Sequence, residues 1–93
     1  MIKNCKDKIT LAIFNRLIVR GIDEQLQRKM YKKLLMVNSA AQLEDLRVPP
    51  GNRLEKKKGK MKGLHCIRVN DQWRVCFRWD NGDAYDVILI DYH

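Results

Sequence analysis

The first forty residues carry apolar side chains at helical spacing. Residues 2–5 are predicted to form a short edge strand, and a first helix follows and ends at Gly21. Its apolar positions are Ile9, Leu11, Ile13, Phe14, Leu17 and Ile18. A second helix begins after Asp23, a typical N-cap residue, and its apolar stripe consists of Leu26, Met30, Leu34 and Val37. The short connection predicts that the two helices are antiparallel.

The period of the pattern changes in the second half of the chain. Ser39 and Gln42 have the spacing of a capping box, which predicts a short third helix ending near Leu46. The segment 48–52 contains two prolines and cannot continue a helix. Beyond it, apolar and polar residues alternate, which predicts strands at 64–69, 73–79 and 84–90. The sequence therefore predicts an α+β fold in which N-terminal helices pack on a mainly antiparallel, twisted β-sheet.

The turns between the strands fix how they pair. Asn81-Gly82 is the preferred pair for a type I′ hairpin, because both positions need positive φ. A three-residue loop at 70–72 places Ile67 opposite Val75 and His65 opposite Phe77 on the face that we expect to form the core. The other face then carries Arg68 opposite Arg74 and Cys66 opposite Cys76, with Arg78 further along the same strand. Facing arginines repel each other unless they are well solvated or an anion lies between them.

Length and charge narrow the function. Ninety-three residues are enough for one domain spanning 1–93, and the formal net charge of +8 favours a polyanionic partner. Six of the positive charges, against one negative, lie between Arg53 and Lys62; they belong to Arg53, Lys56, Lys57, Lys58, Lys60 and Lys62. This run has few apolar residues, so it favours nucleic acid over a membrane surface, although a solvated loop would also tolerate it.

Cysteine and histidine usage points to a metal-free intracellular protein. Three cysteines without CxxC spacing and no apolar leader segment predict a cytoplasmic protein with free thiols. His65 is expected on the core side of its strand, and no set of residues has convincing metal-ligand spacing. We expect neither metal nor cofactor.

The sequence ends in Asp91-Tyr92-His93, directly after the last predicted strand. His exchanges protons near neutral pH, Tyr stacks on bases, and Asp holds an imidazole in its charged form. Together with the lysines and arginines they suit phosphodiester cleavage of RNA, in which the 2′-OH attacks the adjacent phosphorus. A frayed polar terminus is the competing interpretation.

These residues resemble a known family. The blocks Leu46–Glu55, Ile67–Phe77 and Gly82–Val87 and the terminal Asp-Tyr-His are similar to HigB-type plasmid-maintenance killer proteins of the RelE/ParE toxin superfamily. The resemblance implies a RelE-like fold and metal-independent cleavage of translated mRNA on the ribosome. It also implies a HigA-like helix-turn-helix antitoxin, with operator DNA bound only through the toxin–antitoxin complex.

The resemblance also implies roles for single residues. Lys58 corresponds to the lysine of the family's basic loop, Arg68 and Arg74 to arginines near phosphate, and the last three residues to the catalytic end. We therefore predict a catalytic set of His93, Asp91, Tyr92, Lys58 and Arg74. The predicted RNA-binding set is Arg68, Arg78, Arg53, Lys56, Lys57, Lys60 and Lys62.

Two alternatives remain open at this stage. A ParE-like relative would inhibit DNA gyrase and cut nothing. A non-catalytic module would bind RNA or the ribosome through the basic patch alone, and replacing His93 would leave it nearly intact.

Overall fold

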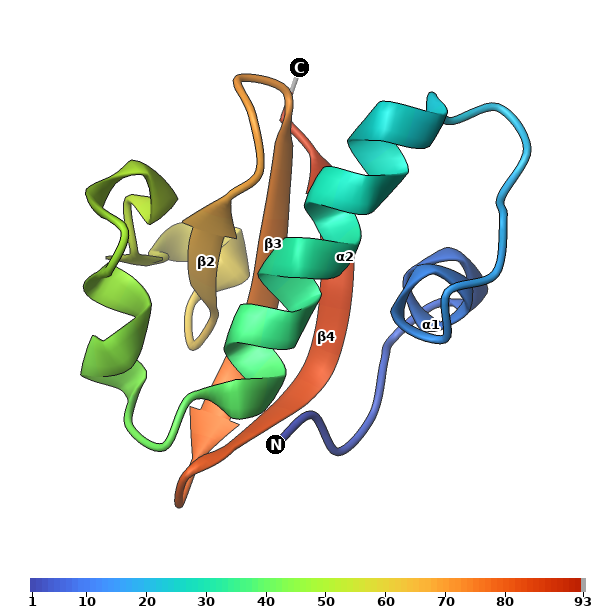
Figure 1. The fold of residues 1–93 in the computed structure, drawn as a ribbon. Coiled ribbons are helices and arrows are strands. Elements are labelled where there is room, and N and C mark those ends of the chain that lie inside the picture. Colours follow the sequence, from blue (N-terminus) through green and yellow to red (C-terminus); the bar gives the residue numbers. More distant parts are fainter. Residues whose placement is uncertain (93) are drawn as a thin grey trace.

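Four strands form one antiparallel sheet in the order β1-β2-β3-β4, and two helices pack on one of its faces (Figure 1). The computed structural model describes residues 1–92. The helices are α1 (Lys8–Phe14) and α2 (Glu24–Ser39), and the strands are β1 (Glu55–Lys56), β2 (His65–Arg68), β3 (Trp73–Asp80) and β4 (Asp83–Asp91). Three short 3₁₀ helices complete the fold: η1 (Leu43–Arg47), η2 (Pro50–Asn52) and η3 (Gly59–Met61). This architecture confirms the α+β prediction.

The register of the sheet agrees with the sequence pattern. Ile67 pairs with Val75, and Arg68 pairs with Arg74, as the three-residue loop requires. Asn81 and Gly82 both have positive φ, 50° and 85°, which is the geometry of the predicted hairpin turn. The alternation is reliable here because a slip of one residue would turn every apolar side chain of the strand to solvent.

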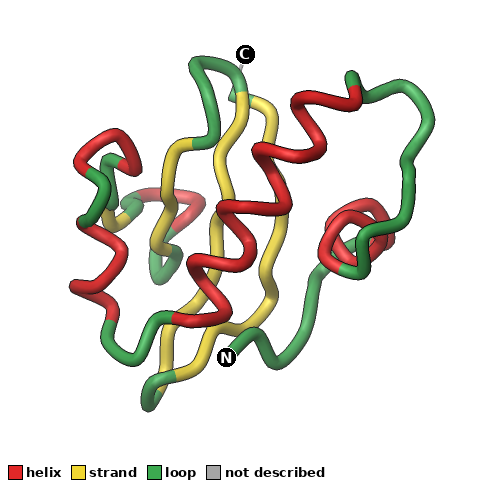
Figure 2. Tube along the Cα trace, in the orientation of Figure 1, coloured by secondary structure: helices red, strands yellow, loops and turns green. Residues whose placement is uncertain are grey.

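The core lies between α2 and one face of the sheet. Met30, Leu34 and Val37 of α2 are fully buried, as are Ile67 and Phe77 of the sheet. The Asp23 carboxylate caps α2 by accepting a hydrogen bond from the Leu26 amide at 3.2 Å. In the view of Figure 2, α2 crosses the strands diagonally, so its apolar stripe covers several of them.

Helix α1 is shorter than predicted. It ends at Phe14 because Arg16 adopts a left-handed conformation with φ of 62°. The amides of Arg16 and Leu17 then bond the carbonyls of Ile13 and Ala12, which is a Schellman motif with arginine where glycine is usual. Leu17 therefore lies beyond the helix and is 61% exposed. In Figure 1, α1 is seen almost along its axis while α2 runs across the view, so the predicted antiparallel arrangement was wrong.

The predicted capping box was displaced by three residues. Ser39 is the last residue of α2, and Gln42 is the N-cap of the third helix, η1. Asp45 accepts hydrogen bonds from the amides of Ala41 and Gln42 at 3.0 and 2.9 Å. The helix is present at the expected place, but an aspartate makes the reciprocal contact.

The edges of the sheet are formed by segments that the pattern shows only weakly. The first six residues run beside β4, where Ile2 and Cys5 make parallel bridges to Ala84 and Val87. On the other side, β1 contributes two exposed residues, Glu55 and Lys56, and was not predicted. No helix in the described part of the chain is long and apolar enough to cross a membrane.

Candidate active site

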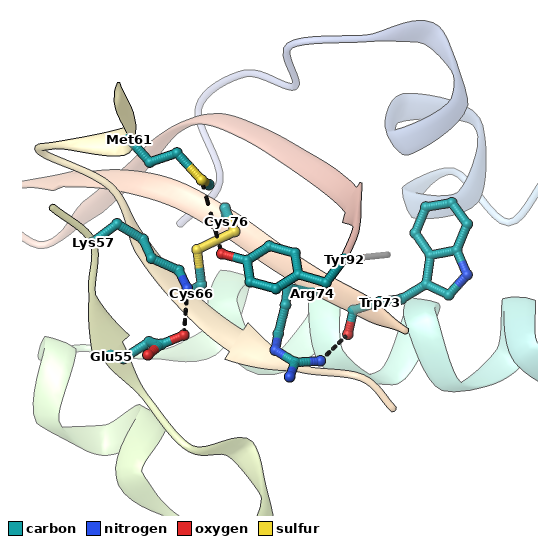
Figure 3. The surroundings of a disulfide bond; sticks show 8 residues. All are labelled: Glu55, Lys57, Met61, Cys66, Trp73, Arg74, Cys76 and Tyr92. Carbon is teal, nitrogen blue, oxygen red and sulfur yellow. Dashed lines mark hydrogen bonds and ion pairs between the residues drawn. A yellow bond between two sulfur atoms is a disulfide. The ribbon is translucent and has the colours of Figure 1, made fainter. Parts of the chain in front are cut away.

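Three segments far apart in sequence meet at one corner of the sheet. They are the β2–β3 loop at 70–72, the end of β4 at 91–92, and the segment 55–61 that contains β1 and η3. The Tyr92 amide donates to the Gln72 carbonyl, and the Lys57 amide donates to the Leu64 carbonyl at 2.8 Å. Backbone pairing therefore fixes both the end of β4 and the basic segment. Figure 3 shows their side chains converging around Tyr92.

Tyr92 lies at the centre of this corner and is half-buried. The Lys57 ammonium is 4.4 Å from the centre of its ring, and the Arg74 guanidinium carbon is 5.1 Å away. The tyrosine hydroxyl contacts the sulfur of Met61 at 3.8 Å. Both cations are within the range of cation–π attraction, so the ring holds two positive charges close together.

Lys57 is a permanent cation at neutral pH. Burial alone would lower the pKa of this lysine, but its contacts with Glu55 and Tyr92 outweigh burial and raise the pKa above the ordinary value. Its ammonium forms an ion pair with the Glu55 carboxylate, and its side chain is 16% exposed. A lysine with a raised pKa cannot serve as a general base near neutrality, but it can stabilise negative charge on a phosphate.

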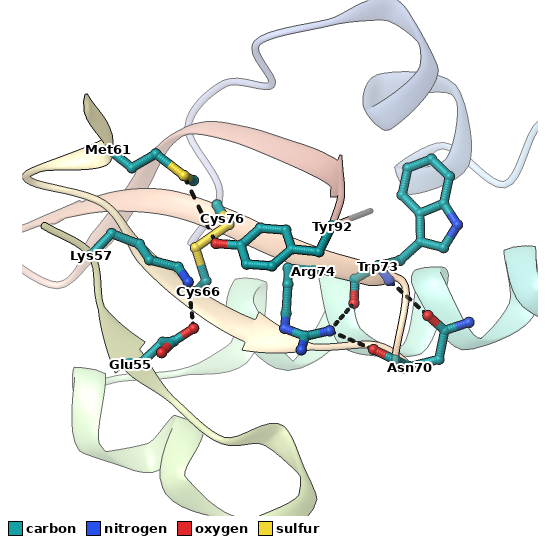
Figure 4. Close-up of polar contacts among 9 residues, drawn as sticks. All are labelled: Glu55, Lys57, Met61, Cys66, Asn70, Trp73, Arg74, Cys76 and Tyr92. Carbon is teal, nitrogen blue, oxygen red and sulfur yellow. Dashed lines mark hydrogen bonds and ion pairs between the residues drawn. A yellow bond between two sulfur atoms is a disulfide. The ribbon is translucent and has the colours of Figure 1, made fainter. Parts of the chain in front are cut away.

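Arg74 is held by the loop beside it. One of its terminal nitrogens donates to the carbonyl of Asn70 and, at 3.1 Å, to that of Trp73 (Figure 4). Arg68, its cross-strand partner, is paired instead with the Asp71 carboxylate. Hydrogen bonding and charge from Arg68 lower the pKa of Asp71. Each of the two facing arginines is thus bonded to its own loop groups, and of these two side chains Arg74 is the one that contacts the Tyr92 ring.

A disulfide joins Cys66 of β2 to Cys76 of β3 near the ring of Tyr92 (Figure 3). We predicted these cysteines as cross-strand neighbours but as free thiols, and the second part of that prediction was wrong. The register places them directly opposite each other with a Cα–Cα distance of 4.1 Å, and both are fully buried. Cys5 is free, and burial followed by the charge of Asp7 raises the pKa of its thiol.

The other predicted catalytic residues are distributed around this corner. Asp91 is the last residue of β4 and accepts a hydrogen bond from the Gln72 side chain at 3.1 Å. Lys58 is exposed and directly precedes η3. His93 lies outside the described residues, so its predicted role stays a prediction.

The predicted RNA-binding residues lie in two neighbouring parts of the surface. Lys57 and Arg68 lie at the corner, while Arg53, in a left-handed conformation after η2, and Lys56 are exposed beside it. Arg78 lies further along β3 and is paired with Asp86 at 2.9 Å. Lys60 and Lys62 flank Met61 and line a separate groove with Arg78.

Sequence reasoning missed two members of the corner. Glu55 was counted only as the single negative charge in the basic run, yet it holds the Lys57 ammonium. Met61 was not considered as a site residue, yet it contacts the Tyr92 hydroxyl. A pairing of β1 with β2 would have placed Glu55, but a two-residue strand has too little alternation to be recognised.

The described part of the chain offers no ready metal centre. Within residues 1–92, no three His, Cys, Asp or Glu side chains lie close enough together to hold a metal ion. His65, as predicted, is half-buried on the core side and packs near Phe77, with ring centres 6.2 Å apart. What the corner provides is cationic side chains, an aromatic ring and a carboxylate.

Two helices on a four-stranded antiparallel sheet, with cations gathered at the end of the last strand, define a small RelE-like domain. A crystal structure of a YafQ mutant from E. coli has this fold: it covers 98% of this chain and 91% of its own, with a TM-score of 0.59 and 14% identity. The chain belongs to the HigB family of RelE-like toxins of type II toxin–antitoxin systems, whose family model matches residues 3–93.

Individual relatives agree with this assignment. The chain is 40% identical over 70 residues to Toxin HigB-1 of Vibrio cholerae serotype O1. The matched segment covers 75% of this chain and 74% of the relative. It is 31% identical over 97 residues to Endoribonuclease HigB of Proteus vulgaris, with both chains covered completely. The family resemblance seen in the sequence is confirmed.

Proposed function

We propose that this chain is the toxin of a type II toxin–antitoxin pair and that it is a ribosome-dependent endoribonuclease, whose cleavage of mRNA arrests translation and growth. The observation that carries the proposal is the placement of Lys57 and Arg74 beside Tyr92 at the end of β4. The Proteus vulgaris relative, similar over its whole length, is named an endoribonuclease.

The corner is suited to a phosphodiester. Lys57 and Arg74 present two cations within reach of one point, and both are oriented by other groups, Lys57 by Glu55 and Arg74 by loop carbonyls. Cations that are already oriented stabilise a charged transition state without reorganising during the reaction. A phosphate bound beside Tyr92 would meet both of them.

RNA supplies its own nucleophile for the reaction. The 2′-oxygen attacks the adjacent phosphorus and gives up its proton to a general base, so a bond from O2′ to phosphorus forms. The bond from phosphorus to the 5′-oxygen breaks, and a general acid protonates that oxygen. The products are a 2′,3′-cyclic phosphate and a 5′-hydroxyl, and water is not consumed in this step.

Proton transfer falls to the chain end. Lys57 and Arg74 are cations and stabilise charge, so Asp91, Tyr92 and His93 are the groups left for acid and base roles. Asp91 accepts a hydrogen bond from the Gln72 side chain at the rim of the corner, and we assign to it the role of holding the His93 imidazole in its charged form. Neither proton step uses a metal ion, and no cofactor takes part.

Membership in a type II family implies an antitoxin partner. We assign a HigA-like helix-turn-helix protein to that role, with operator DNA bound only through the complex. The ribosome presents the message to the toxin in the cytoplasm. The net charge of +8 favours association with ribosomal RNA.

Primer extension on a translated message tests the proposal. Added to a reconstituted translation system, the purified protein should produce cuts inside codons, and the same message without ribosomes should stay intact. A 2′-deoxynucleotide at the cut position should abolish cleavage there, and His93→Ala should slow it by about 100-fold or more. A translated message that stays intact after incubation with the folded, unaltered protein would contradict the proposal.

A further inference from the structure

A hollow on the outer face of the sheet lies next to the corner site. It has a volume of about 380 Å³ and is formed by β3, β4, the segment around η3 and Lys6. Its apolar lining comes from Met61, Leu64, Ile88 and Ile90, which are half-buried. Its charged lining includes Lys6, Lys60, Lys62 and Arg78, which are exposed. The hollow therefore has an apolar floor and a cationic rim.

This groove and the corner site share a wall. Met61 lines the groove, and its sulfur contacts the Tyr92 hydroxyl at 3.8 Å (Figure 3). An RNA strand whose phosphate lies between Lys57 and Arg74 would therefore reach the groove with its neighbouring nucleotides. The basic segment that supplies Lys57 also supplies Lys60 and Lys62, so one stretch of backbone connects the two sites.

From these contacts we infer that the groove is a nucleotide subsite, which holds one unpaired nucleotide adjacent to the phosphodiester that is cut. The inference rests on the proposed endoribonuclease function. An apolar floor suits the flat face of a base, and a cationic rim suits the phosphates on either side of it. The volume lies at the lower end of the range of small-molecule pockets, which fits a single nucleotide rather than a duplex.

Asp86 lies in the lining of the groove. It is the one carboxylate among the described lining residues, and it adopts a left-handed conformation, φ 53°, at an irregularity in the β3–β4 pairing. Such backbone conformations persist only where surrounding contacts stabilise them. Here the Asn4 side chain bonds both the backbone amide and the carboxylate of Asp86, at 3.0 and 2.8 Å.

The Asp86 carboxylate in turn positions Arg78. Hydrogen bonds from Asn4 and then Arg78 lower its pKa, so Asp86 is ionised at neutral pH. It holds Arg78 through Nε at 2.9 Å. Within residues 1–92 the two terminal nitrogens of Arg78 make no hydrogen bond, which leaves them as donors for a phosphate.

Matched double variants test the subsite. Lys6→Gln with Lys62→Gln removes two charges from the rim, and Lys8→Gln with Lys29→Gln removes two exposed charges from the helices. Cleavage of a translated message would be followed as a function of toxin concentration at several salt concentrations. For the groove variant we expect the half-saturating concentration to rise on the order of tenfold and the log–log salt slope to flatten by about 0.7 per lost phosphate contact.

Crosslinking locates the nucleotide directly. Messages carrying 4-thiouridine at single positions flanking the cut, with a 2′-deoxynucleotide at the cut itself, would be irradiated with the toxin on ribosomes. Crosslinks from a flanking position to the 60–64 or 86–90 peptides support the subsite. Equal half-saturating concentrations for the two double variants, or crosslinks only to other surfaces, would overturn it. If the unaltered protein cuts no message, the proposed function itself fails, which is a different result.

Discussion

Two adjacent lysines, Lys57 and Lys58, are candidates for the group that stabilises the phosphate. The family resemblance pointed to Lys58, whereas Lys57 is the lysine that approaches Tyr92, at 4.4 Å from the ring centre. We therefore predict that Lys57→Met slows cleavage strongly and that Lys58→Met slows it only slightly. Methionine keeps an unbranched apolar side chain against the ring and removes the charge, and both variants lose the same single charge.

The expected size of the effect follows from the role of the cation. Removing one oriented donor to a charged transition state costs about 2.7–4 kcal/mol, or roughly 10²- to 10³-fold in rate. The cost in folding stability is much smaller. The ion pair with Glu55 is partly exposed and contributes about 1 kcal/mol or less, and the contact with Tyr92 adds a similar amount. Activity and stability should therefore respond very differently to Lys57→Met.

Single-turnover cleavage on translating ribosomes and thermal denaturation would measure the two quantities separately. A Lys57→Arg variant should recover part of the lost rate, because it restores the charge with a different geometry. A Lys58→Met variant that loses more activity than Lys57→Met would refute the reasoning. So would a Lys57→Met variant that cuts as fast as the unaltered protein.

Four further outcomes are expected. EDTA should leave the rate of cleavage unchanged when Mg²⁺ is present in excess of the chelator, so that the ribosomes stay intact. A loss of cleavage that only Zn²⁺ restores would argue against a metal-independent reaction. Phe77→Ala should lower the free energy of unfolding by about 3–5 kcal/mol in urea titrations, because Phe77 is fully buried in the core. Reducing the Cys66–Cys76 disulfide should cost about 2–3 kcal/mol, since the bond closes a loop with a sequence separation of 10; an unchanged melting temperature in excess dithiothreitol would contradict this. Burial, and then the charge of Lys56, lower the pKa of His65 in the folded state. The stability that the neutral His65 side chain contributes is therefore fully present above the ordinary pKa of about 6.5 and is lost as pH falls through the lowered value. His65→Gln should flatten the decline of melting temperature below about pH 7.

Most of the fold could be predicted from local pattern. Strict alternation and short turns determine the β2–β3–β4 meander, and the stripe and cap of α2 determine that helix. The end of α1 could not be predicted. The left-handed residue that ends a helix is usually glycine and can then be recognised in the sequence, but here it is Arg16. Leu17 and Ile18 continue the apolar pattern of the helix in the sequence, although they lie beyond its last turn.

The candidate site was predictable in composition but not in detail. The Asp91-Tyr92 strand end and the pairing of Arg68 with Arg74 followed from sequence and register. Which arginine faces the tyrosine depends on Asp71 and Asn70. Both lie in a loop, where no periodic pattern of apolar residues predicts the side-chain contacts. The disulfide was missed because the expected compartment argued for thiols, although the register had already placed both cysteines together.

The borders of the sheet bear on how the protein meets other molecules. The segment 1–6 occupies the free side of β4 through main-chain hydrogen bonds, among them Lys3 to Ala84 and Lys6 to Val87, both 2.8 Å. The opposite border is the two-residue, charged strand β1. Short charged strands and covered edges prevent sheets from joining edge to edge. Both borders therefore offer an added strand only short stretches of unpaired backbone, and the free protein has few sites from which to build a fibril.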